Sequence, residues 1–231
     1  MAFLEECITF CGPVWERWVH HPWIEALFAG TLSEDQFNYW MIQNLSYLGN
    51  TVAELAYPKV PAHSQWITAR QEYKEHSQDS RVELRLTEEV GEFALSRWAA
   101  RPARDGLVNF WVRTCYEGTF GDICCAFYVC HSFPVTFGER YKREKPHNLP
   151  AVQKEWVEQW IDPYAEKQRL ATLAGINEYG AQTTEFEREK MKWHFLRGTQ
   201  YQIGTFDAAW NCSDPWYGEG EETGVLAHAP K

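Results

Sequence analysis

The chain has 231 residues and a formal net charge of −10 at pH 7. Its length predicts a single domain with enough material to bury a core. The excess of acid argues against nucleic acid or an anionic membrane surface as the main partner. We read no apolar run that approaches the ~18 residues needed to cross a bilayer, and no basic, apolar leader at the N-terminus. We therefore expect a soluble, cytoplasmic protein.

Cysteine usage points to the same compartment. The chain has seven cysteines, which is an odd number, and their spacing is irregular. Neither feature suits a disulfide framework, so we expect reduced thiols. The positions are 7, 11, 115, 124, 125, 130 and 212.

Helical periodicity of apolar residues recurs along the chain, and strand-like alternation is nearly absent, which predicts an all-α fold. Proline- and glycine-containing breaks separate the helical blocks at 57–61, 100–106, 144–150 and 177–183. We expect one domain over residues 1–211. A mobile C-terminal tail over 212–231 should follow, because that stretch has few periodic apolar residues. The helical blocks are 4–20, 22–30, 33–57, 61–79, 80–99, 105–142, 148–174 and 183–211.

The block that begins at residue 33 contains the first candidate site residues. Ser33 and Gln36 have the spacing of a capping box, which predicts that a helix starts there. Asn44 falls within the apolar stripe of this helix, while Tyr47 and Glu54 share an adjoining face. A buried amide needs partners, since an unpaired polar group costs about 1–3 kcal/mol. Asn44 and Tyr47 are therefore either structural groups with satisfied hydrogen bonds or part of a pocket.

Residues 111–141 contain the second candidate. Pro134 lies four residues after Cys130 in an otherwise helical pattern, so the Cys130 carbonyl loses its usual helical donor and a kink is expected. A kink next to a thiol leaves room for a ligand. Cys130 is then either a nucleophile or one more buried small side chain. His131 cannot pair with it, because adjacent helical residues do not face each other.

Three segments together carry a family resemblance. They are HPWIEALFAGTLSEDQFNYWMIQNLSYL at 21–48, WIDPYAE at 160–166 and FEREKMKWHFLRGTQYQIGTFDAAW at 186–210. These segments resemble the TenA (thiaminase II) family. The resemblance implies a heme-oxygenase-like helical bundle that assembles into a homo-oligomer. It also implies that Cys130 is the nucleophile that attacks an aminopyrimidine ring, that Tyr164 neighbours this nucleophile and that Tyr47 belongs to the same pocket.

Two departures from the family pattern change this expectation. Asn44 stands where the family has an acid near the ring nitrogen, and Gln202 stands where it has an acid near the leaving group. An amide keeps the size and the hydrogen bonding of the acid but cannot transfer a proton, a contribution typically worth about 10²–10⁴-fold per group. Leu107 and Pro134 replace two further aromatic positions. We expect ordinary thiaminase chemistry to be crippled.

Other carboxylates and a metal site were weighed as alternatives. Glu54, Glu83, Glu117 and Asp122 could point inward, but each also suits a solvated helix face, which we favour. A diiron site would need more histidine in the last long helix than His194 alone, and no phosphate-binding glycine motif is present. We therefore expect no metal and no cofactor.

Three functions remain open at this point. The leading one is a divergent TenA-like enzyme, repurposed for secondary metabolism, that acts on a small, planar, nitrogen-containing and heteroaromatic molecule through Cys130, with Asn44 and Gln202 as orienting groups. The second is a binding or regulatory protein that kept the pocket and lost the chemistry. The third is an aminopyrimidine aminohydrolase (thiaminase II) of thiamin salvage, in which Glu54 or another acid substitutes for a lost one.

Overall fold

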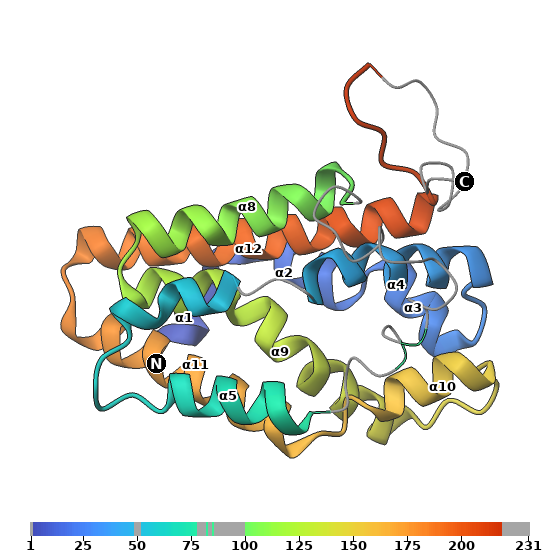
Figure 1. Cartoon of the computed structure of the whole chain (residues 1–231), viewed down its shortest axis with the longest axis horizontal. Coiled ribbons are helices and arrows are strands. Elements are labelled where there is room, and N and C mark those ends of the chain that lie inside the picture. Colours follow the sequence, from blue (N-terminus) through green and yellow to red (C-terminus); the bar gives the residue numbers. More distant parts are fainter. Residues whose placement is uncertain (1, 49–51, 78–81, 83–84, 86–99, 219–231) are drawn as a thin grey trace.

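The computed structural model describes residues 2–48, 52–77, 82, 85 and 100–218, with the side chains of 45–48 left undescribed. These ranges fold into helices joined by short links, without a strand, and the predicted all-α fold is confirmed (Figure 1). The elements are α1 (Phe3–Cys11), α2 (Pro13–Val19), α3 (Pro22–Ala29), α4 (Glu34–Leu48), the 3-10 helix η1 (Val52–Lys59), α5 (Trp66–His76), α8 (Pro102–Glu117), α9 (Phe120–Glu144), α10 (Ala151–Glu158), α11 (Pro163–Gln182) and α12 (Glu185–Asn211).

Helix α9 is the central element, and α11 and α12 are its main neighbours. Helix α11 runs antiparallel to α9. His131 Nδ1 lies 2.8 Å from Thr172 Oγ1, and further along the pair Gly175 is in close contact with Cys124. Most of α9 is buried, because helices cover it on several sides.

Helix α12 runs parallel to α9 and approaches its backbone closely. A Cβ atom at Gly198 would lie 2.6 Å from the carbonyl oxygen of Ala126. Two turns later, the rings of Phe206 and Phe133 are 6.0 Å apart. Glycine at 198 therefore sets the distance between the two helices, and the shared register continues to their C-terminal ends.

An aromatic cluster closes the end of the bundle where α3, α4 and α10 meet α9 and α12 (Figure 1). Trp23, Trp40, Trp156 and Phe206 are all at least 97% buried. Burying a large apolar side chain contributes about 3 kcal/mol, so this cluster is a principal source of stability. The high tryptophan content is thus used largely for packing.

Several predicted boundaries are confirmed and others are wrong. Helix α4 starts with the expected capping box: Ser33 Oγ accepts from the Gln36 N–H at 3.2 Å, and Gln36 Oε1 accepts from the Ser33 N–H at 3.2 Å. The block 105–142 is two helices, because α8 ends at Gly118 and Thr119 caps α9. The block 148–174 is also two helices, and the break predicted at 177–183 begins only at Thr183, because α11 continues to Gln182. The block 80–99 lies outside the described residues, apart from 82 and 85.

Helix α9 corrects the expectation about apolar runs. It is long and apolar enough to span a membrane, but 83% of its most apolar 18-residue window is buried inside the protein. Pro134 lies inside α9, which continues to Glu144, and the kink expected there stays a prediction. The helix is apolar because neighbouring helices surround it.

The first residues of the predicted C-terminal tail pack against the start of α8. Asp214 Oδ2 accepts a hydrogen bond from the Ala103 N–H at 2.6 Å, and the Asp214 carbonyl accepts from Arg101 Nε at 3.0 Å. Trp216 Nε1 donates to the Ala100 carbonyl at 3.3 Å. Residues 213–216 are thus docked, while 219–231 lie outside the described residues and their mobility stays a prediction.

Candidate functional site

Helices α4 and α12 are antiparallel, and two contacts define their register. Gln36 Nε2 donates to the Trp210 carbonyl at 2.8 Å. One turn further along α4, the Trp40 ring stacks on Phe206 at 4.6 Å. Residues four apart lie one above the other on a helix, so the next pair in the series is Asn44 and Gln202. Gln202 is buried and Asn44 is partly exposed.

Helix α9 brings Cys130 to the same level. Phe133 lies 6.0 Å from both Trp40 and Phe206, which makes a three-ring stack from three helices. Cys130 is three residues before Phe133, one turn along the same face of α9. The structure therefore brings Asn44, Cys130 and Gln202 together, one turn beyond the aromatic stack.

Helix α8 covers this level of the bundle. Trp111 Nε1 donates to the Ala126 carbonyl at 3.0 Å, and Leu107, one turn earlier on α8, is fully buried. Since α8 is antiparallel to α9, Leu107 lies at the level of Cys130. The position that is aromatic in the family is an aliphatic wall here.

A buried cation on α8 was missed by the sequence analysis. The Arg104 guanidinium lies 4.9 Å from the centre of the Trp40 ring, and the residue is only 3% exposed. Arg104 falls in the segment ARPARDG, which read as a break between helices. Only the long-range packing of α8 on α4 reveals that it is buried next to the aromatic stack.

Cys130 differs from the neighbouring cysteines in its exposure. Cys115, Cys124 and Cys125 are buried, whereas Cys130 is partly exposed. Burial raises the pKa of the Cys115 thiol to about 11, and it raises the pKa of Cys124 and Cys125 well above the usual value. A buried thiol of this kind is inert, because the thiolate is the nucleophile. Among the cysteines of α9, only Cys130 is accessible to a ligand.

His131 points away from Cys130, as predicted. The Thr172 hydroxyl donates to the Gln168 carbonyl and accepts from Trp66 Nε1, so it can accept a further hydrogen bond from His131 Nδ1–H. Burial, with the positive charge of Arg70, lowers the pKa of His131 well below its usual value. The ring is therefore a neutral packing group and not a base for Cys130.

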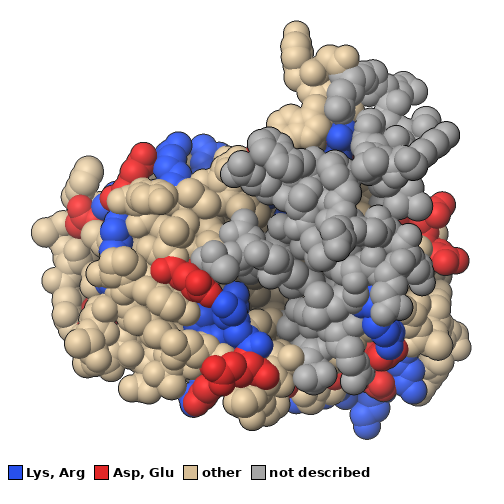
Figure 2. Space-filling model, viewed as in Figure 1, with Lys and Arg blue, Asp and Glu red and all other residues tan. Residues whose placement is uncertain are grey.

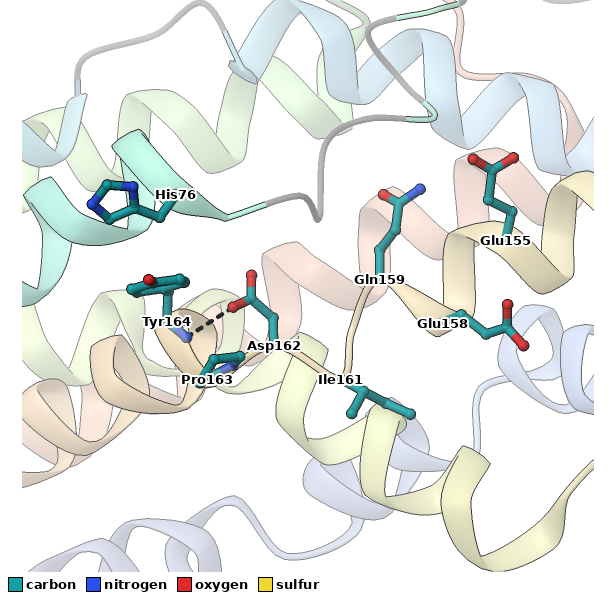
Figure 3. A pocket seen from close by; sticks show the side chains of 8 residues that line it. All are labelled: His76, Glu155, Glu158, Gln159, Ile161, Asp162, Pro163 and Tyr164. Atoms are coloured by element: carbon teal, nitrogen blue, oxygen red, sulfur yellow. Dashed lines mark hydrogen bonds between the residues drawn. The ribbon is translucent and has the colours of Figure 1, made fainter.

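Tyr164 lies in a separate cavity of about 370 Å³ near the N-terminus of α11 (Figure 3). Its ring is 5.1 Å from that of His76 on α5, and Asp162 caps the helix through the Tyr164 N–H at 2.8 Å. Thr172, which is level with His131, is eight residues further along α11, or about 12 Å. The structure therefore brings Tyr164 together with His76, about two turns from the Cys130 level.

The other predicted residues lie at the surface or outside the described residues. Glu54 forms an ion pair with Lys74 at the surface between η1 and α5, and the side chain of Tyr47 lies outside the described residues. Glu83 also lies outside them, and Glu117 is exposed and paired with Arg113. None of the described contacts links Glu54 with Cys130.

The expectation that Asp122 faces solvent is wrong. Its side chain is fully buried, because Oδ2 accepts from the Thr119 N–H at 2.7 Å and from the Thr119 hydroxyl at 2.9 Å in the capping box of α9. Lys190 Nζ lies 3.1 Å from the same oxygen. The contact with His194, followed by the bonds to Thr119 and Lys190, lowers the pKa of Asp122 against the opposing effect of burial. The carboxylate is a helix cap.

Within the described ranges, no three side chains of His, Cys, Asp or Glu converge in a way that could hold a metal ion. Charges of both signs alternate over the described part of the face seen in Figure 2. The helix registers thus align amide, thiol and aliphatic side chains at the Cys130 level.

Comparison with known proteins gives this arrangement a context. An aminopyrimidine aminohydrolase from Bacillus subtilis is 25% identical over 238 residues, which cover 99% of each chain. A TenA homologue from Pyrococcus furiosus shares the fold with a TM-score of 0.74 at 16% identity, covering 90% of this chain and 99% of that one. A structure described as a TenA family transcription regulator, from Silicibacter sp. TM1040, has a TM-score of 0.72 at 18% identity and covers 90% and 96%. The pattern of the TENA/THI-4/PQQC family matches residues 11–211, and the chain belongs to that family.

Proposed function

We propose that the protein is a divergent TenA-type enzyme that acts on a small, planar, nitrogen-containing molecule held at the Cys130 level. The observation that supports this most is the shared register of α4, α9 and α12, which aligns Asn44, Cys130 and Gln202. In this proposal a flat ring lies between the buried Leu107 side chain and the three-ring stack, and the two amides offer both donors and acceptors to its nitrogens.

In this proposal Cys130 is the nucleophile of a hydrolysis. Its Sγ forms a bond to an electron-poor ring carbon, the C–N bond to an amine breaks, and the amine leaves with the thiol proton. Water then attacks the same carbon, which releases the hydroxylated ring and returns a proton to the thiol. Asn44 and Gln202 orient the ring without exchanging protons, and their amide side chains make this reaction slower than one assisted by two acids. Tyr47 is the further expected contributor, whereas Tyr164 lies in the separate cavity with His76.

Restoring the acids tests the proposal. The double variant Asn44→Asp/Gln202→Glu should release ammonia from an aminopyrimidine faster than the wild type, by about 10²–10⁴-fold for each acid that regains a proton-transfer role. Gln200→Glu is the matched control, because Gln200 is on the same helix but accepts from Arg197 on the outer face. It should leave the rate unchanged. No gain in the double variant, with its fold intact by circular dichroism, contradicts the assignment of this pocket to an aminopyrimidine-like ring.

The thiol has its own test. A thiol-reactive pyrimidine should label Cys130 stoichiometrically in the folded protein, as read by intact-mass and peptide mass spectrometry, while Cys115, Cys124 and Cys125 stay unlabelled because they are buried. Cys212 is also partly exposed, so Cys212→Ser serves as the background. Cys130→Ser should lose both labelling and turnover. Labelling that persists in Cys130→Ser rejects the nucleophile.

A binding or regulatory protein is the second candidate, and the paired loss of both acids favours it. It predicts that Cys130→Ser binds the heteroaromatic molecule as tightly as the wild type, with no turnover in either protein. The third candidate, an aminopyrimidine aminohydrolase that uses Glu54, predicts wild-type hydrolysis that collapses in Glu54→Gln. The Glu54–Lys74 ion pair at the surface gives this reading the least support.

A further inference from the structure

A second groove, of about 430 Å³, lies on the outer side of α8 and α12. None of the residues aligned at the Cys130 level lines it, and Arg197 and Gln200 mark this outer face of α12. Its lining residues are Phe110, Arg113, Phe186, Glu189, Lys190, Trp193, His194 and Arg197. The volume is in the range of small-molecule sites.

The walls of the groove are aromatic and unusually exposed. Phe186 is 76% exposed and Trp193 is 50% exposed. On the other side, the Phe110 ring stacks on His194 at 6.1 Å and on Tyr201 at 5.3 Å, with interplanar angles below 30°. Large apolar rings left in water on one face commonly mark a binding site. The near-parallel rings suit a flat aromatic guest, since offset stacking is a preferred geometry.

His194 adds a polar ring to the lining of this groove. Its Nδ1 lies 2.9 Å from the Lys190 carbonyl, which only an N–H can satisfy, and 3.3 Å from Oδ1 of the buried Asp122. These contacts fix the orientation of the ring next to Phe110.

Two exposed arginines flank the aromatic walls. Arg113 is one turn after Phe110 and pairs with Glu117 at 3.2 Å, with both side chains about 70% exposed. Arg197 is one turn after Trp193 and donates to Gln200 at 2.8 Å. Surface pairs of this kind contribute about 0–1 kcal/mol, so both guanidinium groups can turn toward a ligand at little cost. In a chain of net charge −10, this face is one where an anion can approach two cations.

We propose that this groove binds a flat aromatic carboxylate, with the ring on Trp193 and Phe186 and the carboxylate on Arg113 and Arg197. The groove does not depend on the chemistry at Cys130.

The test uses indole-3-acetate as the probe and 3-methylindole as its neutral analogue. Proton–nitrogen NMR should show the indole N–H signal of Trp193, identified by its absence in Trp193→Phe, shifting with the carboxylate in a saturable way. The neutral analogue should bind at least tenfold more weakly. Arg113→Gln/Arg197→Gln should raise the Kd for indole-3-acetate at least tenfold, to the level of the neutral analogue, because bidentate arginine pairs bind carboxylates strongly.

Matched controls come from exposed residues elsewhere. Arg143→Gln removes a similarly exposed arginine of α9 that also pairs with a glutamate, and Leu170→Ala removes an exposed apolar side chain of α11. Both should leave the Kd unchanged. Equal affinity for the neutral analogue, or an unchanged Kd in the double arginine variant, overturns the proposal. The proposal is also overturned if Phe186→Ala changes the sedimentation coefficient in the absence of any probe. That result would assign the groove to self-association.

Discussion

At the scale of single residues, polar groups that look alike in the sequence have different tasks. Asn44 and Gln202 lie one turn from an aromatic stack, whereas Gln36 is a capping residue that also reaches the Trp210 carbonyl. Asp122 is a buried cap, and Glu117 is a surface acid. Spacing along a helix does not distinguish these roles, because the role of a side chain depends on which helix packs opposite it.

His131 predicts how stability depends on pH. Burial lowers the pKa of His131, and burial also lowers the pKa of His21 in spite of its contact with Asp207. The unfolded chain then binds more protons than the folded one below the unfolded pKa of about 6.5. Stability is therefore complete above that pH and is lost as the pH falls, by up to about 1.4 kcal/mol per unit for each histidine.

Urea unfolding at pH 7.5 and pH 5.5 measures this slope. His131→Gln keeps a donor for Thr172 and should reduce the change in unfolding free energy between the two pH values. His147→Gln, at an exposed position, should leave that change as in the wild type. Equal slopes in His131→Gln and the wild type would show that His131 does not carry the effect.

At the scale of elements, the contact between α9 and α12 determines the geometry of the candidate site. The two helices are parallel and are closest at Gly198. Cys130 and Gln202 each lie four residues further along, toward the aromatic stack. Any widening at Gly198 thus separates the thiol from the amide.

Two glycines of α12 form a matched pair for this idea. Gly198→Ala should destabilise the protein by about 1–3 kcal/mol, because its Cβ would overlap the Ala126 carbonyl oxygen. Gly204→Ala should be neutral or stabilising by up to about 1 kcal/mol, since its Cβ would meet only the Ala103 Cβ at 3.9 Å. Thermal unfolding of the two variants checks the sign of each change. A neutral Gly198→Ala would mean that α9 and α12 tolerate a wider spacing.

At the scale of the whole molecule, a segment from the end of the chain completes a helix from its middle. Asp214 caps α8, whose own N-cap residue, Arg101, makes no side-chain capping bond. Asp214→Ala should therefore cost about 1 kcal/mol, as the loss of an N-cap does. Tyr217→Ala, at a fully exposed position, should change stability by less than about 0.5 kcal/mol. Urea unfolding measures both, and equal stability of the two variants would contradict the capping role.

Much of the fold was predictable from the sequence, and the site only in part. Ser33 and Gln36 signalled the start of α4 because a capping box is local. The breaks at Gly118 and at 159–162 were missed because the apolar period continues across them. The level shared by Asn44 and Gln202 required the α4–α12 register, which depends on packing between residues far apart in the chain. The burial of Arg104 and the Tyr164–His76 cavity are long-range features of the same kind.

The cap on α8 also has a consequence for synthesis. Ala103 leaves the ribosome 111 residues before Asp214, and domains are made at about 5–20 residues per second. The first turn of α8 therefore waits several seconds or more for its hydrogen-bond acceptor.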